Sequence, residues 1–301
     1  MRYILTIVIL ALLPFALTAI NANAGEYGFQ FLQIPVSPVA SALGGTGIYA
    51  TSYAGAFIQN PAANLLEERF SLSLQHNIWI VDTSTSQLVY SNGNRNRHFG
   101  LVGRMLDYGE LENRDDTGLL IGKYHPLDAN LMANYALRIM PDHLLGINAG
   151  LVYEKLDTAS SFGLSADLGY VYLTPVTNAI LFSSVRNIGY TSKMDKESIK
   201  LPLTVEAGVG YTIPELAFAD RISQQLTFKK AVDTDFLASY AAEVSFWQIL
   251  ALRLGYKFLY DEEGITAGMG INWHNLEIDY GWTSFSDRLN DSHSFGITYN
   301  F

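Results

Sequence analysis

The sequence contains no cysteine, and only 16% of its 301 residues are charged. The absence of cysteine excludes a disulfide framework and thiolate metal sites. Acidic residues outnumber basic ones and give a formal net charge of −10 at pH 7, which argues against nucleic acid as a partner. After residue 24, no apolar run approaches the roughly 20 residues that a membrane-spanning helix needs.

The one long apolar run lies at the start of the sequence and has the form of a secretory signal. Arg2 precedes an apolar run from Ile4 to Ile20, and Ala22-Asn23-Ala24 has the small-x-small pattern cut by signal peptidase. We therefore predict a cleaved signal peptide over residues 1–24; the alternative is a membrane anchor, for which the run is short. An exported chain with 13% aromatic residues and no later spanning helix is either a soluble β protein or an outer-membrane barrel.

Residues 25–67 do not follow the pattern of the rest of the chain. The stretch from Phe31 to Leu66 is rich in Gly, Ala, Ser and Pro, and it carries almost no charge. It has too many apolar side chains for a flexible linker, which is the alternative, and its small residues allow backbones to approach closely. We predict that residues 25–67 form a compact hatch inside a barrel made by residues 68–301.

Residues 68–301 alternate between apolar and polar side chains, as β-strands do. From Leu250 to Tyr260 every second residue is Leu, Tyr or Phe, whereas the residues between them include Arg253 and Lys257. The polar faces are mostly Gly, Ser, Thr and Asn, which suits a crowded barrel interior better than the surface of a soluble sandwich. We therefore predict an all-β fold, a transmembrane antiparallel β-barrel of about 14 strands. The predicted strands are 68–81, 84–92, 97–107, 127–139, 142–156, 160–172, 178–188, 202–213, 222–230, 234–247, 249–260, 263–273, 275–284 and 292–301.

Several charged residues fall on the inward face of the predicted strands. Such charges usually pair with one another or with a plug, so we interpret them as supports for the hatch, with transport selectivity as the alternative. They are Glu154, Asp167, Glu206, Glu243, Arg253, Lys257, Glu277 and Asp279.

The end of the chain also fits a barrel. The last strand alternates and ends on Phe301, which is similar to the signal read by outer-membrane insertion machinery. The longest predicted connections follow odd-numbered strands and the tightest follow even-numbered ones. We therefore expect long loops at one end of the barrel and short turns at the other.

Patterns for catalysis or metal binding are missing. Gly45 to Ala50 fits the dinucleotide fingerprint G-x-G-x-x-A, but no strand precedes it and no helix follows it. We predict no enzyme activity, no cofactor and no metal site. The acidic loop residues Asp115, Asp116 and 261–263 are interpreted as solvated loop tips, with divalent-cation binding as the alternative. The histidines show no metal-ligand spacing; they are His76, His98, His125, His143, His274 and His293.

Short motifs in the hatch and the first strand resemble the PorV/PorQ family of outer-membrane proteins, whose barrels are FadL-like. The first-strand motif comprises His76, Trp79 and Asp82. The hatch motif comprises Pro35, Ser37, Ala40, Leu43, Gly44, Gly45, Asn60, Pro61 and Ala62. These motifs cover about a fifth of the chain.

The resemblance implies a part in type IX protein secretion, as a cargo shuttle or a surface-attachment component in the outer membrane of a Gram-negative-type bacterium. The implied partners are outer-membrane lipid, the translocon, attachment-complex proteins and cargo C-terminal domains. A FadL-like channel for hydrophobic small molecules is the alternative, and a barrel of another duty stays open. The small and polar residues on the inner strand faces favour protein handling weakly over a channel.

Overall fold

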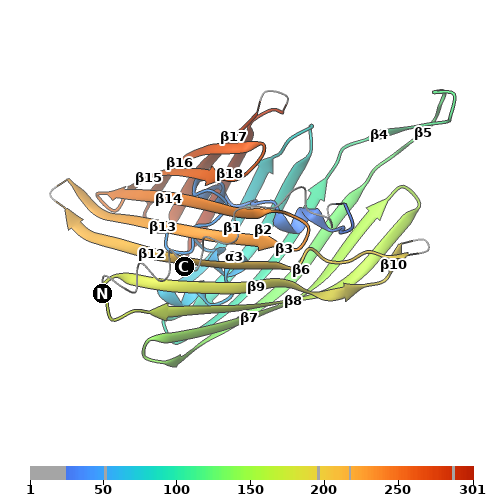
Figure 1. Cartoon of the computed structure of the whole chain (residues 1–301). Helices are drawn as coiled ribbons and strands as arrows, with labels where there is room; N and C mark the ends of the chain where they lie inside the picture. Colours follow the sequence, from blue (N-terminus) through green and yellow to red (C-terminus); the bar gives the residue numbers. More distant parts are fainter. Residues whose placement is uncertain (1–24, 51–52, 195–196, 217, 287–288) are drawn as a thin grey trace.

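The structure, a computed structural model, describes residues 25–50, 53–194, 197–216, 218–286 and 289–301. Fourteen antiparallel strands form a closed barrel in which each barrel strand pairs with its neighbours in sequence order, and β1 pairs with β18 to close the wall (Figure 1). This confirms the predicted fold class. The predicted signal peptide, residues 1–24, lies outside the described residues.

The fourteen barrel strands are longer than most strands of soluble proteins, and several exceed the 9–11 residues that cross a membrane when tilted. They are β1 (Arg69–Ile78), β2 (Ser84–Gly93), β3 (Arg97–Asp107), β6 (Leu127–Met140), β7 (His143–Leu156), β8 (Ala159–Leu173), β9 (Ala179–Thr191), β12 (Thr204–Leu216), β13 (Ala219–Ala231), β14 (Phe236–Phe246), β15 (Leu250–Phe258), β16 (Glu263–Trp273), β17 (Leu276–Phe285) and β18 (Ser292–Asn300).

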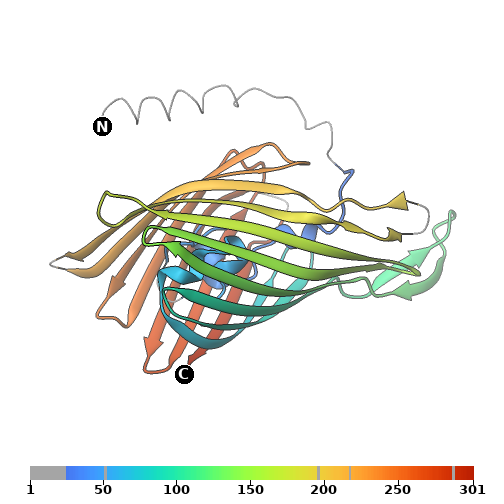
Figure 2. The same cartoon turned by 90° about the horizontal axis from the view of Figure 1, so that it is seen from below.

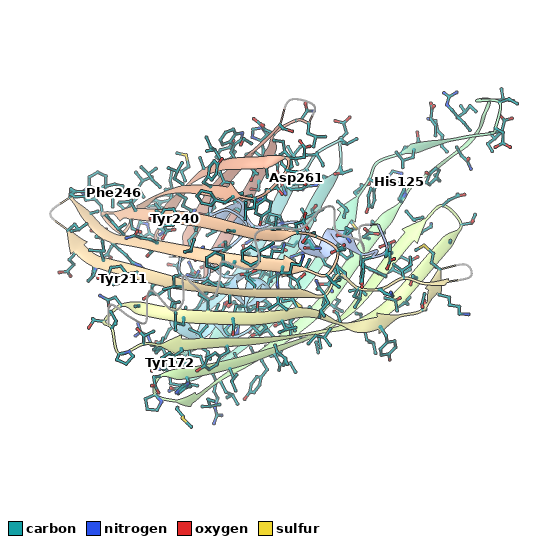
Figure 3. All side chains as sticks on the ribbon, viewed as in Figure 1. His125, Tyr172, Tyr211, Tyr240, Phe246 and Asp261 are labelled. Atoms are coloured by element: carbon teal, nitrogen blue, oxygen red, sulfur yellow. The ribbon has the colours of Figure 1, made fainter. Side chains whose placement is uncertain are left out.

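The alternation in the sequence becomes a difference between the two faces of the wall. On β1, Leu72 and Leu74 are exposed on the outside, whereas Ser71 and Ser73 are buried inside. Side chains project outward along the whole barrel, and Tyr172, Tyr211 and Phe246 lie toward one end of it (Figure 3). The outer surface is therefore apolar with aromatic residues near an end, as a lipid-facing wall requires.

The two ends of the barrel differ in their connections. Long loops follow β3, β9 and β17, whereas tight turns join β6 to β7 and β16 to β17. Two of the long loops contain small sheets that the sequence did not predict: β4 (Leu111–Arg114) with β5 (Leu120–Tyr124), and β10 (Lys193–Met194) with β11 (Glu197–Ser198). The β4–β5 hairpin projects away from the barrel (Figures 1 and 2). We call these ends the long-loop end and the short-turn end.

Strand β1 is shorter than predicted. It ends at Ile78 because Val81 and Asp82 both adopt positive φ, 55° and 57°, in a tight connection to β2. Such a turn matches the twist of a hairpin. Trp79 and Asp82, predicted on the first strand, therefore lie in the connection after it. The strand predicted at 222–230 is longer than expected, since β13 begins at Ala219 and pairs with the end of β12.

The N-terminal segment, residues 25–67, runs through the barrel interior (Figures 1 and 2). Its first part lies at the long-loop end, where the Gly28 N–H donates to the Lys200 carbonyl at 3.2 Å. The segment then crosses the lumen and reaches β1 at the short-turn end. Its short helices are η2 (Gln30–Gln33), α2 (Pro38–Ala42), α3 (Ala56–Gln59) and η3 (Ala63–Leu66). In the part of the chain that the structure describes, no helix has the length and apolarity to span a membrane.

Candidate functional site

Two cavities lie inside the barrel, one on each side of the N-terminal segment. The outer cavity, of about 570 Å³, opens at the long-loop end. Its floor is the N-terminal segment at Ile34, Pro35 and 44–46, and its walls come from strands and from the long-loop connections. Its apolar wall residues are Trp79, Ile80, Leu237, Leu259, Tyr260, Phe285 and Leu289. Trp79 and Phe285 meet edge to face with their ring centroids 5.1 Å apart.

The inner cavity, of about 420 Å³, opens at the short-turn end. Its roof is the other side of the N-terminal segment, including Ile48, Tyr49 and Tyr53. Its cationic side chains are Arg69, Arg95, Arg138 and Arg221.

The linings of the two cavities come within one residue of each other along the N-terminal segment. Thr46 lines the outer cavity and Ile48 lines the inner one, so Gly47 alone separates the two linings along the chain. Gly47 has φ 126°, a backbone conformation that residues other than glycine rarely adopt. We call residues 46–49 the partition.

Side chains of β13 hold the partition in place. The Gln225 amide donates to the Thr46 hydroxyl, and its carbonyl oxygen accepts from the Tyr49 N–H at 3.4 Å. The Arg221 guanidinium donates to the Tyr49 carbonyl at 3.0 Å and lies over the Tyr49 ring. The sequence did not single out either side chain, because an inward Gln or Arg looks like any other polar lumen residue.

The Asn60-Pro61 turn of the hatch motif is fixed directly to the wall. Asn60 is fully buried, and its amide donates to the backbone carbonyls of Ser183 at 2.9 Å and Tyr170 at 3.3 Å. A Cβ built on Gly146 would lie 2.2 Å from the Pro61 carbonyl oxygen, and one on Gly169 would lie 2.4 Å from the Asn60 side chain. These two glycines are cross-strand partners. The wall therefore carries no side chains where the Asn60-Pro61 turn packs against it.

The hatch-motif residues between Ala40 and Gly45 lie against strands β14 to β18. Helix α2, which contains Ala40, packs on β16 and β17. The Thr266 hydroxyl donates to the Ala42 carbonyl at 2.9 Å and accepts from the Gly44 N–H at 3.1 Å. Gly44 and Gly45 have positive φ and face Ser239 and Lys257. The remaining members, Pro35, Ser37, Leu43, Pro61 and Ala62, are buried.

The eight predicted lumen charges are all buried, but they do not form one site. Arg253 donates to Glu243 at 2.7 Å and to Asp279 at 2.6 Å, which joins three strands. Glu277 pairs with Arg69 at 3.3 Å. These three ion pairs, which involve four of the eight predicted residues, lie within the barrel strands, not against the N-terminal segment.

The other four charges lie nearer the N-terminal segment or the outer cavity. Glu154 accepts the Phe29 N–H at 2.7 Å. Asp167 accepts the Asn187 N–H at 2.8 Å, at an irregularity in the β8–β9 pairing. Glu206 and Lys257 line the outer cavity, and Lys257 pairs with Glu263. Their predicted role as hatch supports stays a prediction.

The first-strand motif does not converge on one site. His76 lies on the outer face of β1, where its Nδ1 is 2.9 Å from the Ser86 hydroxyl, whereas Trp79 lines the outer cavity. Phe301 lies at the barrel seam, stacked on Phe70 with ring centroids 4.5 Å apart. Over the described ranges, no group of three His, Asp or Glu side chains is placed to hold a metal ion.

Comparison with known proteins identifies the fold. No protein-family model and no curated protein sequence matches the chain. Among solved structures, the CymD monoaromatic hydrocarbon channel matches with a TM-score of 0.66 at 13% identity, over 94% of this chain and 99% of CymD. The toluene transporter TodX of Pseudomonas putida matches with a TM-score of 0.63 at 12% identity, over 88% of this chain and 97% of TodX.

A third structure extends the likeness. A FadL homologue of Pseudomonas aeruginosa matches with a TM-score of 0.55 at 10% identity, over 89% of this chain and 99% of the homologue. Nothing in these matches points to the PorV/PorQ family that the motifs resemble. At these low identities the likeness concerns the fold alone: the chain has the architecture of FadL-like outer-membrane β-barrels.

Proposed function

We propose that the protein is an outer-membrane channel for hydrophobic small molecules, closed by a hatch formed by residues 25–67. This was the alternative in the sequence analysis, and the fold comparisons favour it over a role in protein secretion. The observation that carries the proposal is the outer cavity. At about 570 Å³ it is within the size range of small-molecule sites, and aromatic and aliphatic side chains cover much of its wall.

The route through the barrel needs one movement. The outer and inner cavities are separated by the partition, residues 46–49, which two side chains of β13 attach to the wall. A molecule in the outer cavity reaches the inner one when the partition moves, so we propose that the partition is the gate. The rest of the hatch need not leave the barrel, because Asn60 and α2 are attached elsewhere.

The polar inner strand faces, which favoured protein handling in the sequence, have a different explanation. Gly255 faces Leu43 and Gly44, Gly268 faces Ala42, and Gly281 faces Pro38. These small residues accommodate the hatch. The apolar part of the outer cavity comes mainly from the connections and strand ends around it. The small and polar residues on the inner strand faces are therefore compatible with a hydrophobic ligand in the outer cavity.

The test is uptake of labelled toluene by whole cells that express the barrel, because a lipopolysaccharide leaflet slows hydrophobic molecules that cross plain phospholipid vesicles unaided. We expect uptake above that of cells without the barrel, and faster uptake with Gln225→Ala, which frees the partition. The matched control is Gln224→Ala, because Gln224 lies next in the chain and its side chain accepts a hydrogen bond from the Tyr240 hydroxyl instead of holding residues 46–49. Equal uptake with and without the barrel would contradict the channel, and equal rates for Gln225→Ala and wild type would contradict the gate.

A role in type IX secretion, predicted from the motifs, stays a prediction. It would use the long loops, and the projecting β4–β5 hairpin exposes Leu119, Leu120 and Ile121 to solvent. Mild-detergent purification from native outer membranes, followed by mass spectrometry, separates the two roles. Translocon or attachment proteins, or cargo with a shared C-terminal domain, would support secretion; bound hydrophobic small molecules without protein partners would support the channel.

A further inference from the structure

The two cavities carry opposite charge. Six acidic and two basic side chains line the outer cavity, a formal net charge of −4, whereas four arginines and one glutamate line the inner cavity, a formal net charge of +3. The acidic residues of the outer cavity are Glu206, Asp233, Asp235, Asp261, Glu262 and Glu263, and its basic residues are Lys229 and Lys257. A molecule that crosses the barrel therefore meets both signs in turn.

The buried carboxylates of the outer cavity are only partly paired. Glu206 is 3% exposed and forms an ion pair with Arg186 at 3.4 Å through one oxygen, whereas its other oxygen has no hydrogen-bond partner among the described residues. One oxygen of Asp233 is likewise buried without a partner in the described part of the chain, while the other accepts from Gln30 at 2.5 Å. Lys257 is neutralised by Glu263.

Lys229, the cross-strand neighbour of Glu206, offsets part of this charge, although no ion pair joins their side chains within the described ranges. Asp235, Asp261 and Glu262 are exposed at the rim of the cavity, and they add negative charge there. An anion that approaches the outer cavity therefore meets like charge at the rim.

The inner cavity has the reverse arrangement. Arg221 and Arg69 each lie 3.3 Å from a Glu67 carboxylate oxygen. Among the described residues Arg138 donates only to backbone carbonyls, those of Arg95 at 2.8 Å and Pro141 at 2.5 Å, and no carboxylate there pairs with it. Arg95 lies beside it at the β2–β3 turn and makes no ion pair with any described residue. A cation that reaches this side meets like charge.

We infer that the two cavities form a double charge filter, which passes uncharged hydrophobic molecules and rejects amphiphiles that carry a full charge of either sign. The inference rests on the proposed channel function and adds its substrate class. Anions are rejected on the outer side and cations on the inner side. Specificity of this kind arises from repulsion of the wrong molecules, not from extra contacts to the right one.

The test compares three molecules built on the same ring: toluene, benzoate and benzylammonium. Uptake by whole cells is measured at neutral pH, where the latter two are charged, and cells without the barrel give the background. We expect channel-dependent uptake of toluene and at least about tenfold slower channel-dependent uptake of each ion, as modest like-charge repulsion would produce. High salt should reduce the difference, because it screens the exposed charges.

Two pairs of substitutions separate the two halves of the filter. Glu206→Gln with Asp233→Asn should speed benzoate uptake about threefold or more and leave benzylammonium slow; Arg95→Gln with Arg138→Gln should do the reverse. Asp233→Asn alone serves for the outer side if the buried Glu206 variant fails to assemble. The controls on the projecting hairpin, Asp116→Asn and Arg114→Gln, change the net charge by one each, as Asp233→Asn alone does, and should change neither rate.

The outcomes distinguish the filter from the channel. Toluene uptake with rejection of both ions, and the crossed response of the two variants, would support the filter. Equal uptake of all three molecules would overturn the filter and leave the channel. A variant that changes the uptake rates of benzoate and benzylammonium by the same factor would also overturn the filter. Toluene uptake no faster than the background would overturn the channel, and the filter with it.

Discussion

Asn60 offers the sharpest test of whether the N-terminal segment closes the barrel. Its side chain makes three hydrogen bonds: two to wall carbonyls, at 2.9 Å and 3.3 Å, and one from the Ala62 N–H, at 3.0 Å. Asn60→Ala removes all three and leaves a buried N–H unpaired. An unpaired buried group costs about 1–3 kcal/mol and each lost hydrogen bond about 1 kcal/mol, so docking should weaken by about 3 kcal/mol. The population with an undocked hatch should then rise roughly a hundredfold.

The assay is the sensitivity of cells to a bulky antibiotic that an intact outer membrane excludes. We expect Asn60→Ala to raise sensitivity and Asn92→Ala to leave it unchanged, since Asn92 is exposed and contacts only the nearby Tyr90 hydroxyl among the described residues. The heat-dependent shift of the folded barrel on gels shows whether each variant is assembled in normal amounts. Unchanged sensitivity in a normally assembled Asn60→Ala barrel would refute the hatch.

Three further predictions concern the seam, the buried charges and the projecting hairpin. Deleting Phe301 should lower the amount of assembled barrel on heat-shift gels, because it removes the ring stacked on Phe70 and an N–H bonded to the Phe70 carbonyl at 2.9 Å; normal levels would contradict this. Arg253→Met should lower barrel stability in thermal unfolding by about 3–5 kcal/mol because two buried carboxylates lose their cation, whereas Arg114→Met, in an exposed ion pair, should cost at most about 1 kcal/mol. Hydrogen bonds from Thr117 and from the Leu119 N–H lower the pKa of Asp115 below its ordinary 3.8. Its stabilisation of the hairpin tip is therefore present above the ordinary pKa and is lost only as the pH falls through the lowered one. Amide exchange at Leu119 that accelerates already at the ordinary pKa would count against it.

The sequence predicted the barrel well because alternation is a local property of each strand. Leu72, Leu74, Ser71 and Ser73 could be assigned to opposite faces without any knowledge of their neighbours in space. The end of β1 could not be predicted in this way, because the two residues with positive φ, Val81 and Asp82, are not glycines and so give no signal of a turn. The small loop sheets were missed because their strands are short and do not alternate.

The candidate site was harder to predict. Gly146 and Gly169 interrupt alternating strands, and such glycines often mark a close approach of another backbone, but the sequence does not say which backbone. Gln225 and Arg221 gave no signal, because their partners lie about 170 residues away or more, in the N-terminal segment. The outer cavity is assembled from connections and strand ends that meet only when the barrel closes. The inward-facing strand residues alone therefore do not show how apolar the wall of the outer cavity is.

The position of Gly28 at the long-loop end constrains how the molecule is built. Short turns of outer-membrane barrels face the periplasm, and the segment enters β1 from that side, so residues 25–28 have crossed the whole lumen. A chain end cannot easily be drawn through a finished, tightly packed barrel. The N-terminal segment should therefore be laid across the open sheet first, and the β1–β18 seam should close around it. The same geometry places the start of the described chain at the end of the barrel that faces the cell exterior, so the N-terminal segment spans the lumen from the long-loop end to the short-turn end.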